Sequence, residues 1–224
     1  MVEVIIFTEG PTEEKFVKAM LAPAFRPSQI YLKPQTLNTS QDAKGGAVSF
    51  DRLKFNARNT LRQKPDAILT TLIDLYGLAT DFPGFDEAKK LTNVYSRVTA
   101  LESDLHAAII EHVGCQPGRF IPYIQPYEFE GLLFSDVNAL VLTEPDWKHH
   151  LPKLQAVRAD FDTPEHINDS FETKPSKRLE KLLVPKYKKT RHGPLAAERV
   201  TLARMEQECA HFRGWMTKLR GLSA

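Results

Sequence analysis

Residues 2–16 have the sequence VEVIIFTEGPTEEKF. The run from Val2 to Phe7 is apolar apart from Glu3 and rich in β-branched residues, which is typical of a strand buried in a parallel sheet. The run ends at Thr8-Glu9-Gly10, and Pro11 suits the first position of a helix whose first turn is acidic. The segment therefore predicts a strand, a tight turn and a helix, in that order.

The same alternation of strand and helix patterns continues along the first half of the chain. Apolar runs predict further strands at residues 29–32, 66–73 and 119–124. Apolar stripes at helical spacing predict helices at 50–62 and 94–113, the second closed by Gly114. A polar loop with Lys44-Gly45-Gly46 precedes the helix at residue 50.

After residue 125 only helical patterns follow. They cover residues 136–141, 149–159, 164–171, 175–184 and 195–215, and Pro126 suggests an additional helix start just past the fourth strand. We expect an α/β fold, with a small parallel sheet and helices on both of its faces. The expected domains are an α/β domain at 1–135 and a helical, basic extension at 136–224 packed on it.

Composition excludes several classes of protein. The chain has 224 residues, 42% hydrophobic and 26% charged, which is typical of a soluble globular protein with a core of its own. No apolar run approaches the length of a membrane span, and the N-terminus lacks the pattern of a secretory signal, so we expect a cytoplasmic protein. The two cysteines, Cys115 and Cys209, are not in a CxxC pattern, so we expect buried, reduced thiols.

The net charge of +2 hides an uneven distribution. Residues 1–173 contain 17 Lys and Arg against 24 Asp and Glu, a balance of −7, whereas residues 174–224 contain 13 against 4, a balance of +9. A cationic segment favours contact with nucleic acid, because Lys and Arg near phosphates release condensed counterions. The alternative is an ordinary solvated surface.

Acidic side chains follow three of the predicted strands. Glu9 follows the first and Asp74 the third, while Glu128 and Glu130 follow the fourth. Because the carboxyl ends of parallel strands meet at one edge of a sheet, we expect these acids to converge there. Converging carboxylates repel one another unless a cation lies among them, and Mg²⁺ prefers oxygen ligands. For any single acid the alternative is helix capping, above all for Glu13 near the third position of its helix.

The sequences EGPTE at 9–13 and IDLYG at 73–77 resemble the Toprim domain of topoisomerases, primases and the nucleases of the overcoming-lysogenization-defect family. The resemblance implies Mg²⁺ (or Mn²⁺)-dependent phosphodiester chemistry, with Glu9 as the glutamate after strand one and Asp74 as the first aspartate of a DxD pair. Tyr76 stands where the second aspartate is expected. Glu13, Glu128 and Glu130 are the candidates to complete a metal shell.

Further motifs cover most of the chain. DLYG at 74–77 with DFPG at 81–84, QPYEFEGLLFSD at 125–136 and PSKRL at 175–179 resemble a bacterial family of unknown function with a Toprim-like core. Members of that family are often encoded beside an ABC/SMC-type ATPase in operons that look like mobile-element or phage-defence systems. The resemblance therefore implies such an ATPase as a partner.

Cations in the basic segment are candidates for phosphate contacts. Lys177 in PSKRL is the first choice for stabilising the charge that develops during phosphoryl transfer. The loop KYKKTRHG at 186–193 combines lysines with an aromatic residue and is suited to following a phosphate backbone. The predicted nucleic-acid contacts are Lys177, Arg178, Lys186, Lys188, Lys189 and Arg191. A surface role is the alternative for each of them.

Together these features predict a Mg²⁺-dependent nuclease, a hydrolase with Glu9, Asp74 and Lys177 as catalytic residues and water as the nucleophile. The substrate is DNA or RNA, the partner is the ATPase, no membrane is involved, and a homo-oligomer is left open. The alternative is a non-catalytic Toprim-like module that binds the ATPase or nucleic acid, and Tyr76 favours it. A topoisomerase or primase is poorly supported, because strand-passage and zinc-ribbon features are missing.

Overall fold

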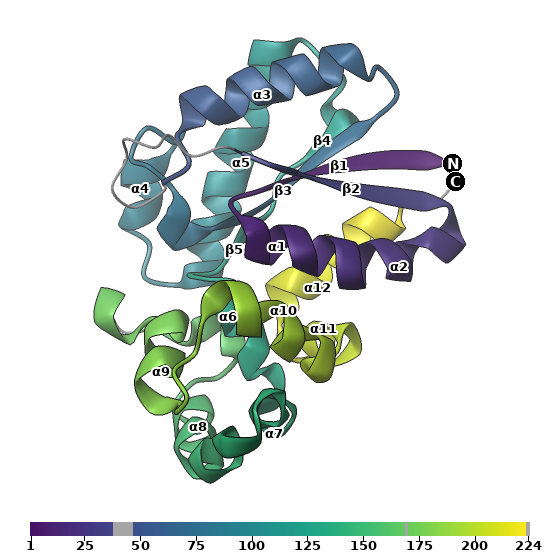
Figure 1. Ribbon diagram of the computed structural model, residues 1–224. Coiled ribbons are helices and arrows are strands. Elements are labelled where there is room, and N and C mark those ends of the chain that lie inside the picture. Colours follow the sequence, from purple (N-terminus) through teal and green to yellow (C-terminus); the bar gives the residue numbers. More distant parts are fainter. Residues whose placement is uncertain (38–46, 169, 223–224) are drawn as a thin grey trace. The chain divides into compact units, whose positions relative to one another are not determined.

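The computed structural model describes residues 1–37, 47–168 and 170–222 (Figure 1). The chain forms two compact units, one made of Met1–Gln125 with Lys218–Ala224 and the other of Pro126–Thr217. The predicted α/β class is confirmed, with a small parallel sheet flanked by helices and a helical C-terminal extension. The predicted loop at Lys44-Gly45-Gly46 lies outside the described residues.

The sheet of the first unit is parallel throughout, in the order β2-β1-β3-β4. β5 also pairs with β3, nearer the carboxyl end of that strand than β4 does. Its main strands are β1 (Val2–Thr8), β2 (Ile30–Thr36) and β3 (Ile68–Asp74). Residues 4–8 of β1 are all buried, so both faces of the central strand are covered. Figure 1 shows α3 (Phe50–Gln63) and α5 (Val94–Val113) on one face and α1 (Pro11–Phe16) and α2 (Ala22–Phe25) on the other.

The single strand expected at 119–124 is wrong, because two short strands occupy this segment, β4 (Phe120–Ile121) and β5 (Ile124–Gln125). Pro122 lies between them and has no N–H to donate to a ladder. Side chains of β3 replace the missing ladder bonds, since the Thr71 hydroxyl donates to Tyr123 O and accepts from Tyr123 N, each at 2.8 Å. The carboxylate of Glu102 accepts the backbone N–H of Ile124 at 2.8 Å.

The helices of the first unit begin and end as the sequence indicates. Pro11 begins α1, and the helix continues through a π-helical turn (Val17–Leu21) into α2. Asn93 caps α5 by accepting from Ser96 N at 3.0 Å, and Gly114 ends it with φ +71°, as predicted. A short helix, α4 (Phe85–Lys89), lies between β3 and α5.

The second unit is built from helices. They are α6 (Glu130–Leu133), α7 (Val137–Leu140), α8 (Leu151–Ala159), α9 (Pro175–Leu182), α10 (Lys189–Val200), α11 (Leu202–Glu208) and α12 (Ala210–Arg220), the last of which ends in the first unit. Its core contains the fully buried side chains of Trp147, Phe134 and Phe212. The carboxylate of Glu165, 1% exposed, accepts the N–H groups of His211 and Phe212 at 3.0 Å each and so caps the first turn of α12.

Three predictions for this unit are wrong. The helix expected at 164–171 is replaced by 3₁₀ turns at Pro164–His166 and Phe171–Thr173. The long helix expected at 195–215 is divided among α10, α11 and α12, because Thr201 adopts φ +73° and ends α10. The helix expected at Pro126 begins only at Glu130, after Tyr127 with φ +56°.

Both cysteines are free thiols. Cys209 is buried, as predicted, and burial raises the pKa of its thiol well above the usual range. The predicted burial of Cys115 is wrong, since this residue is only half-buried.

Candidate active site

The candidate site lies where β1 and β3 end side by side. Glu9 follows the last residue of β1, and Asp74, 4% exposed, is the last residue of β3. The backbone N–H of Asp74 donates to Glu9 Oε1 at 2.6 Å. Two acidic residues that are 65 positions apart in sequence are thus neighbours at the carboxyl edge of the sheet.

Gly77 makes room for the Glu9 carboxylate. A Cβ atom at residue 77 would lie 2.1 Å from Glu9 Oε1 and 2.5 Å from Glu9 Cδ. Gly77 ends a 3₁₀ turn that starts at Leu75, and its carbonyl accepts the N–H of Val48 at 2.8 Å, which fastens the turn to a neighbouring segment. No role for Gly77 could be predicted from the DLYG motif, because the space it leaves is filled by a side chain that follows another strand.

Tyr76 occupies the position that the Toprim resemblance reserves for a second aspartate. Its side chain is 37% exposed, in contrast to the buried Asp74 two residues earlier. A phenol in this place supplies neither a carboxylate nor its charge at neutral pH. Any carboxylate ligand besides Glu9 and Asp74 therefore has to come from another segment.

Two further acids lie on the helix that follows Glu9. Glu13, 2% exposed, is in the first turn of α1, and its Oε2 would be 3.5 Å from a Cβ at Gly10. Glu14, which the sequence analysis did not single out, accepts from the Thr36 hydroxyl at 3.3 Å. The Thr36 hydroxyl also bonds the Thr8 hydroxyl at 3.2 Å, so the ends of β1 and β2 are joined next to Glu9.

Among the described residues, no group of three or more His, Cys, Asp or Glu side chains is placed to hold a metal ion. Mg²⁺ is usually bound in proteins by one or two carboxylates, with waters and substrate phosphates as the other ligands. Glu9 and Asp74 fit that donor set, and Gly77 leaves the space that the Glu9 carboxylate occupies.

Glu128 belongs to the second unit and is held there by its own partners. Lys174 Nζ lies 2.8 Å from Glu128 Oε1, and Ser176 N donates to Glu128 Oε2 at 2.9 Å. Burial alone would raise the pKa of this carboxyl, but the hydrogen bonds from Lys174 and Ser176 outweigh burial and hold the pKa below its ordinary value. Lys174 was missed in the sequence analysis, although it directly precedes the PSKRL motif.

Glu130 is fully buried in the same unit. It accepts from the Tyr187 hydroxyl at 3.1 Å, and Lys189 Nζ lies 3.4 Å from its second oxygen. Burial and the negative charge of Glu130 raise the pKa of Tyr187 well above its usual range. Glu128 and Glu130 therefore each have a lysine within their own unit, and their predicted roles as metal ligands stay predictions.

The predicted phosphate-contacting cations lie on and between α9 and α10. Lys177 is 3.4 Å from Glu180, a pair one helical turn apart, and Lys186 is 3.3 Å from the same carboxylate. Arg191 pairs with Glu144 at 2.5 Å, while Arg178 lies over the ring of Phe161. The expected loop at 186–193 is partly wrong, because α10 starts at Lys189, and its aromatic residue, Tyr187, is buried and cannot stack on a base.

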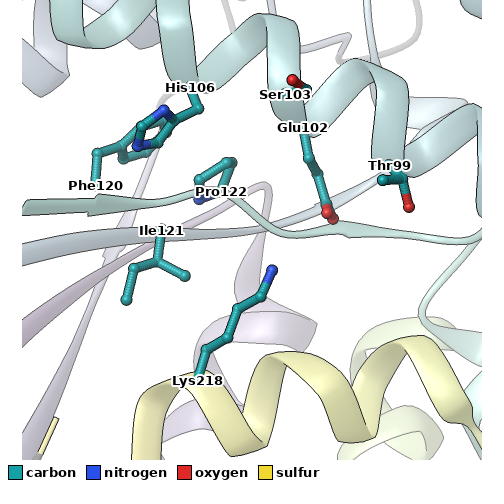
Figure 2. A pocket seen from close by; sticks show the side chains of 8 residues that line it. All are labelled: Thr99, Glu102, Ser103, His106, Phe120, Ile121, Pro122 and Lys218. Carbon is teal, nitrogen blue, oxygen red and sulfur yellow. The ribbon is translucent and has the colours of Figure 1, made fainter. Parts of the chain in front are cut away.

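A separate hollow of about 350 Å³ lies between α5 and β4. Figure 2 shows His106 stacked beside Phe120 and the Lys218 side chain pointing into the hollow. The His106 ring nitrogen Nε2 is 3.0 Å from Pro117 O, and Glu102 holds the backbone of Ile124. Glu102 thus supports the interrupted strand, His106 bonds the turn before it, and neither Glu9 nor Asp74 lines the hollow.

The chain matches a known family over most of its length. Residues 8–220 match the model of a domain of unknown function (DUF4276), so the chain belongs to that family. No curated protein and no solved structure matches the chain. Within residues 1–37, 47–168 and 170–222, no helix combines the length and the apolar character needed to cross a membrane.

Proposed function

We propose that this DUF4276 chain is a Mg²⁺-dependent phosphodiesterase that cleaves nucleic acid. The observation that carries the proposal is the Glu9 carboxylate held at 2.6 Å by the backbone N–H of Asp74, at the joint ends of two parallel strands. The carboxyl edge of a parallel sheet is where ligands of α/β proteins bind. The EGPTE and DLYG motifs lie at this edge, and their resemblance to Toprim domains supports the proposal.

The roles of the residues follow from their placement. The Asp74 N–H fixes the orientation of the Glu9 carboxylate, and the Asp74 side chain, at the end of β3, would add a second carboxylate. A bound Mg²⁺ would supply charge stabilisation at the phosphoryl oxygens and lower the pKa of a bound water. Glu9 and Asp74 would hold it, and the Gly77 turn keeps side-chain bulk out of the site.

The biological setting belongs to the same proposal. Its basis is the resemblance to bacterial proteins encoded beside an ABC/SMC-type ATPase. The chain would act together with such an ATPase, in the cytoplasm, against phage or mobile elements. DNA and RNA are both substrates of the proposed chemistry, because the reacting group is the phosphodiester they share. The cations at residues 177–191 would add affinity for the phosphate backbone.

Cleavage assays test the proposal. Plasmid DNA and cellular RNA are incubated with the full chain and Mg²⁺ or Mn²⁺, alone and with the partner ATPase. We expect Glu9→Gln and Asp74→Asn to reduce cleavage about 100-fold or more, while Glu14→Gln, a neighbouring acid on α1, retains it. Cleavage that survives in both Glu9→Gln and Asp74→Asn would show that the active centre is elsewhere.

The second candidate function is a non-catalytic module that binds the ATPase or nucleic acid. The observation that favours it is Tyr76, exposed where the Toprim resemblance calls for a second carboxylate. Absence of cleavage by the wild-type chain with every metal, substrate and partner combination, together with intact binding to the ATPase, would make this the better account.

A further inference from the structure

Gln125 begins the QPYEFEGLLFSD motif and ends β5, at the same edge of the sheet as the candidate site. In the parallel pair of β3 and β5, Gln125 is the direct partner of Asp74. Neighbouring strands lie about 5 Å apart, and directly paired residues direct their side chains to the same face of a sheet. Gln125 is fully buried and Asp74 is 4% exposed. A buried amide thus lies beside a buried carboxylate.

Tyr123 sets the orientation of this amide. Its hydroxyl donates to Gln125 Oε1 at 2.6 Å. A glutamine amide has one acceptor oxygen and one NH₂ group with two donors, so the bond from Tyr123 fixes which end is the acceptor and presents the NH₂ group to the remaining neighbours. Buried N–H groups of native proteins are almost always bonded, and a carboxylate is a stronger acceptor than a neutral carbonyl. The register places such a carboxylate, that of Asp74, beside the amide.

Tyr123 is itself held by the strand that carries Asp74. Its side chain is 1% exposed, and its backbone N–H and carbonyl both bond the hydroxyl of Thr71, each at 2.8 Å. Thr71 lies three residues before Asp74 on β3. The chain of contacts therefore starts on β3, passes through Tyr123 to Gln125, and ends beside the last residue of the same strand.

The chemistry of this chain suits a carboxylate that binds a cation. Burying a phenol and an amide costs free energy unless their bonds are made, and apolar side chains would fill the same space without that cost. Carboxylates that bind metal ions are in turn held by hydrogen bonds from residues behind them. An amide supplies such a bond without a positive charge. By contrast, Lys174 and Lys189 hold the carboxylates of the second unit, and an ammonium group repels a second cation.

We propose that Gln125 is a positioning residue for Asp74. Its NH₂ group donates to the Asp74 carboxylate and holds it in the orientation that binds the divalent cation, while Tyr123 keeps the donor end of the amide in place. This inference rests on the proposed function, because it takes Asp74 as a ligand of that cation. It gives a role to the first residue of the motif at 125–136.

Titration of the full chain with Mn²⁺, followed by electron paramagnetic resonance of the free ion, measures the first consequence. Gln125→Leu, which keeps the bulk but not the amide, should weaken Mn²⁺ binding about 10- to 100-fold, as loss of a residue that holds a metal ligand does. Tyr123→Phe should weaken it less, and should add nothing in a Gln125→Leu background, because the hydroxyl acts through the amide. The control is Thr70→Val on β3, which removes a buried hydroxyl that donates to Ile121 O and should bind Mn²⁺ as the wild-type chain does.

Nuclear magnetic resonance of the metal-free chain tests the contact itself. The side-chain NH₂ signals of Gln125, identified by their absence in Gln125→Leu, should move upfield in Asp74→Asn, because the donor loses a charged acceptor, and stay in place in Thr70→Val. Circular dichroism and thermal unfolding verify that each variant is folded. Wild-type Mn²⁺ affinity in Gln125→Leu, or Gln125 signals that Asp74→Asn leaves unchanged, would overturn this inference and leave the proposed function standing. A wild-type chain that binds no Mn²⁺ would overturn both, so the two failures are distinguishable.

Discussion

Replacing Gly77 by alanine probes the geometry of the candidate site at a single atom. The added Cβ would lie 2.1 Å from Glu9 Oε1, well inside van der Waals contact. The backbone of Gly77 is not in the left-handed region, so alanine meets no backbone strain there. The carboxylate is the end of a flexible side chain and will swing away, which breaks its hydrogen bond with the Asp74 N–H.

The magnitude follows from that hydrogen bond. A hydrogen bond to a charged group contributes about 1.5–3 kcal/mol, and a Gly-to-Ala change returns about 0.4–1 kcal/mol by restricting the unfolded chain. We therefore expect Gly77→Ala to lower the free energy of unfolding by about 1–2 kcal/mol. Cleavage should fall more, about 100-fold, because a displacement of about 1 Å in a catalytic group has that effect.

Urea unfolding and the cleavage assay measure these effects, with Gly118→Ala as the matched control, since a Cβ at Gly118 meets no atom within 4 Å. A double-mutant cycle isolates the interaction. In a Glu9→Ala background, Gly77→Ala should no longer reduce the free energy of unfolding, because the clashing carboxylate is gone. The reasoning is refuted if Gly77→Ala resembles Gly118→Ala, or if its effect is the same with and without the Glu9 side chain.

Three further predictions concern other parts of the chain. Glu102→Ala leaves the buried backbone N–H of Ile124 without its acceptor and should lower the free energy of unfolding by about 1–3 kcal/mol. Thermal unfolding measures this loss, and Glu111→Ala, on the exposed face of the same helix, is the control that should show none. Burial and the neighbouring Arg191 lower the pKa of His192, so the folded state favours the neutral imidazole. The contribution of His192 to stability should therefore be full above about pH 6.5 and fall as the pH drops below that value. Thermal unfolding between pH 8 and 5 should show a flatter pH dependence for His192→Gln than for the wild-type chain. Neutralising Lys186, Lys188 and Arg191 should make the salt dependence of nucleic-acid binding shallower, by about 0.7–0.9 for each phosphate that these cations neutralise, and an unchanged slope would assign them to a solvated surface.

The His192 prediction also has a geometric basis. The backbone N–H of Lys188 donates to His192 Nδ1 at 2.8 Å, and Glu144 Oε1 is 3.1 Å from Nε2. Nδ1 therefore acts as an acceptor, and the proton of the neutral ring is on Nε2. Protonation of Nδ1 would remove the hydrogen bond from Lys188, so acid conditions act against this packing.

The sequence was sufficient for the three long strands and for the helix ends that have local signals, but not for the break between β4 and β5. A buried apolar run predicted β1 and β3, and Pro11 and Gly114 predicted helix ends through their own backbone conformations. Convergence of Glu9 and Asp74 followed from the parallel topology, because consecutive strand–helix units direct all strand ends to one edge.

Other features depend on contacts between distant segments and could not be predicted. The role of Gly77 requires the position of Glu9, and the partners of Glu128 and Glu130 come from residues 174–189. The break at Thr201 opposes local preference, since a β-branched residue rarely adopts positive φ. The helical periodicity of residues 195–215 therefore continues across a break that only the tertiary structure imposes.

The central claim is that Glu9 and Asp74 together hold a divalent cation, and a Mn²⁺ titration followed by electron paramagnetic resonance of the free ion tests it most directly. The wild-type chain and Glu14→Gln should each bind Mn²⁺ at a site that Glu9→Gln and Asp74→Asn both lose. Competition by Mg²⁺ should displace the bound Mn²⁺, as expected for carboxylate ligands. Equal binding in all four proteins, or loss in Glu14→Gln alone, would contradict the account.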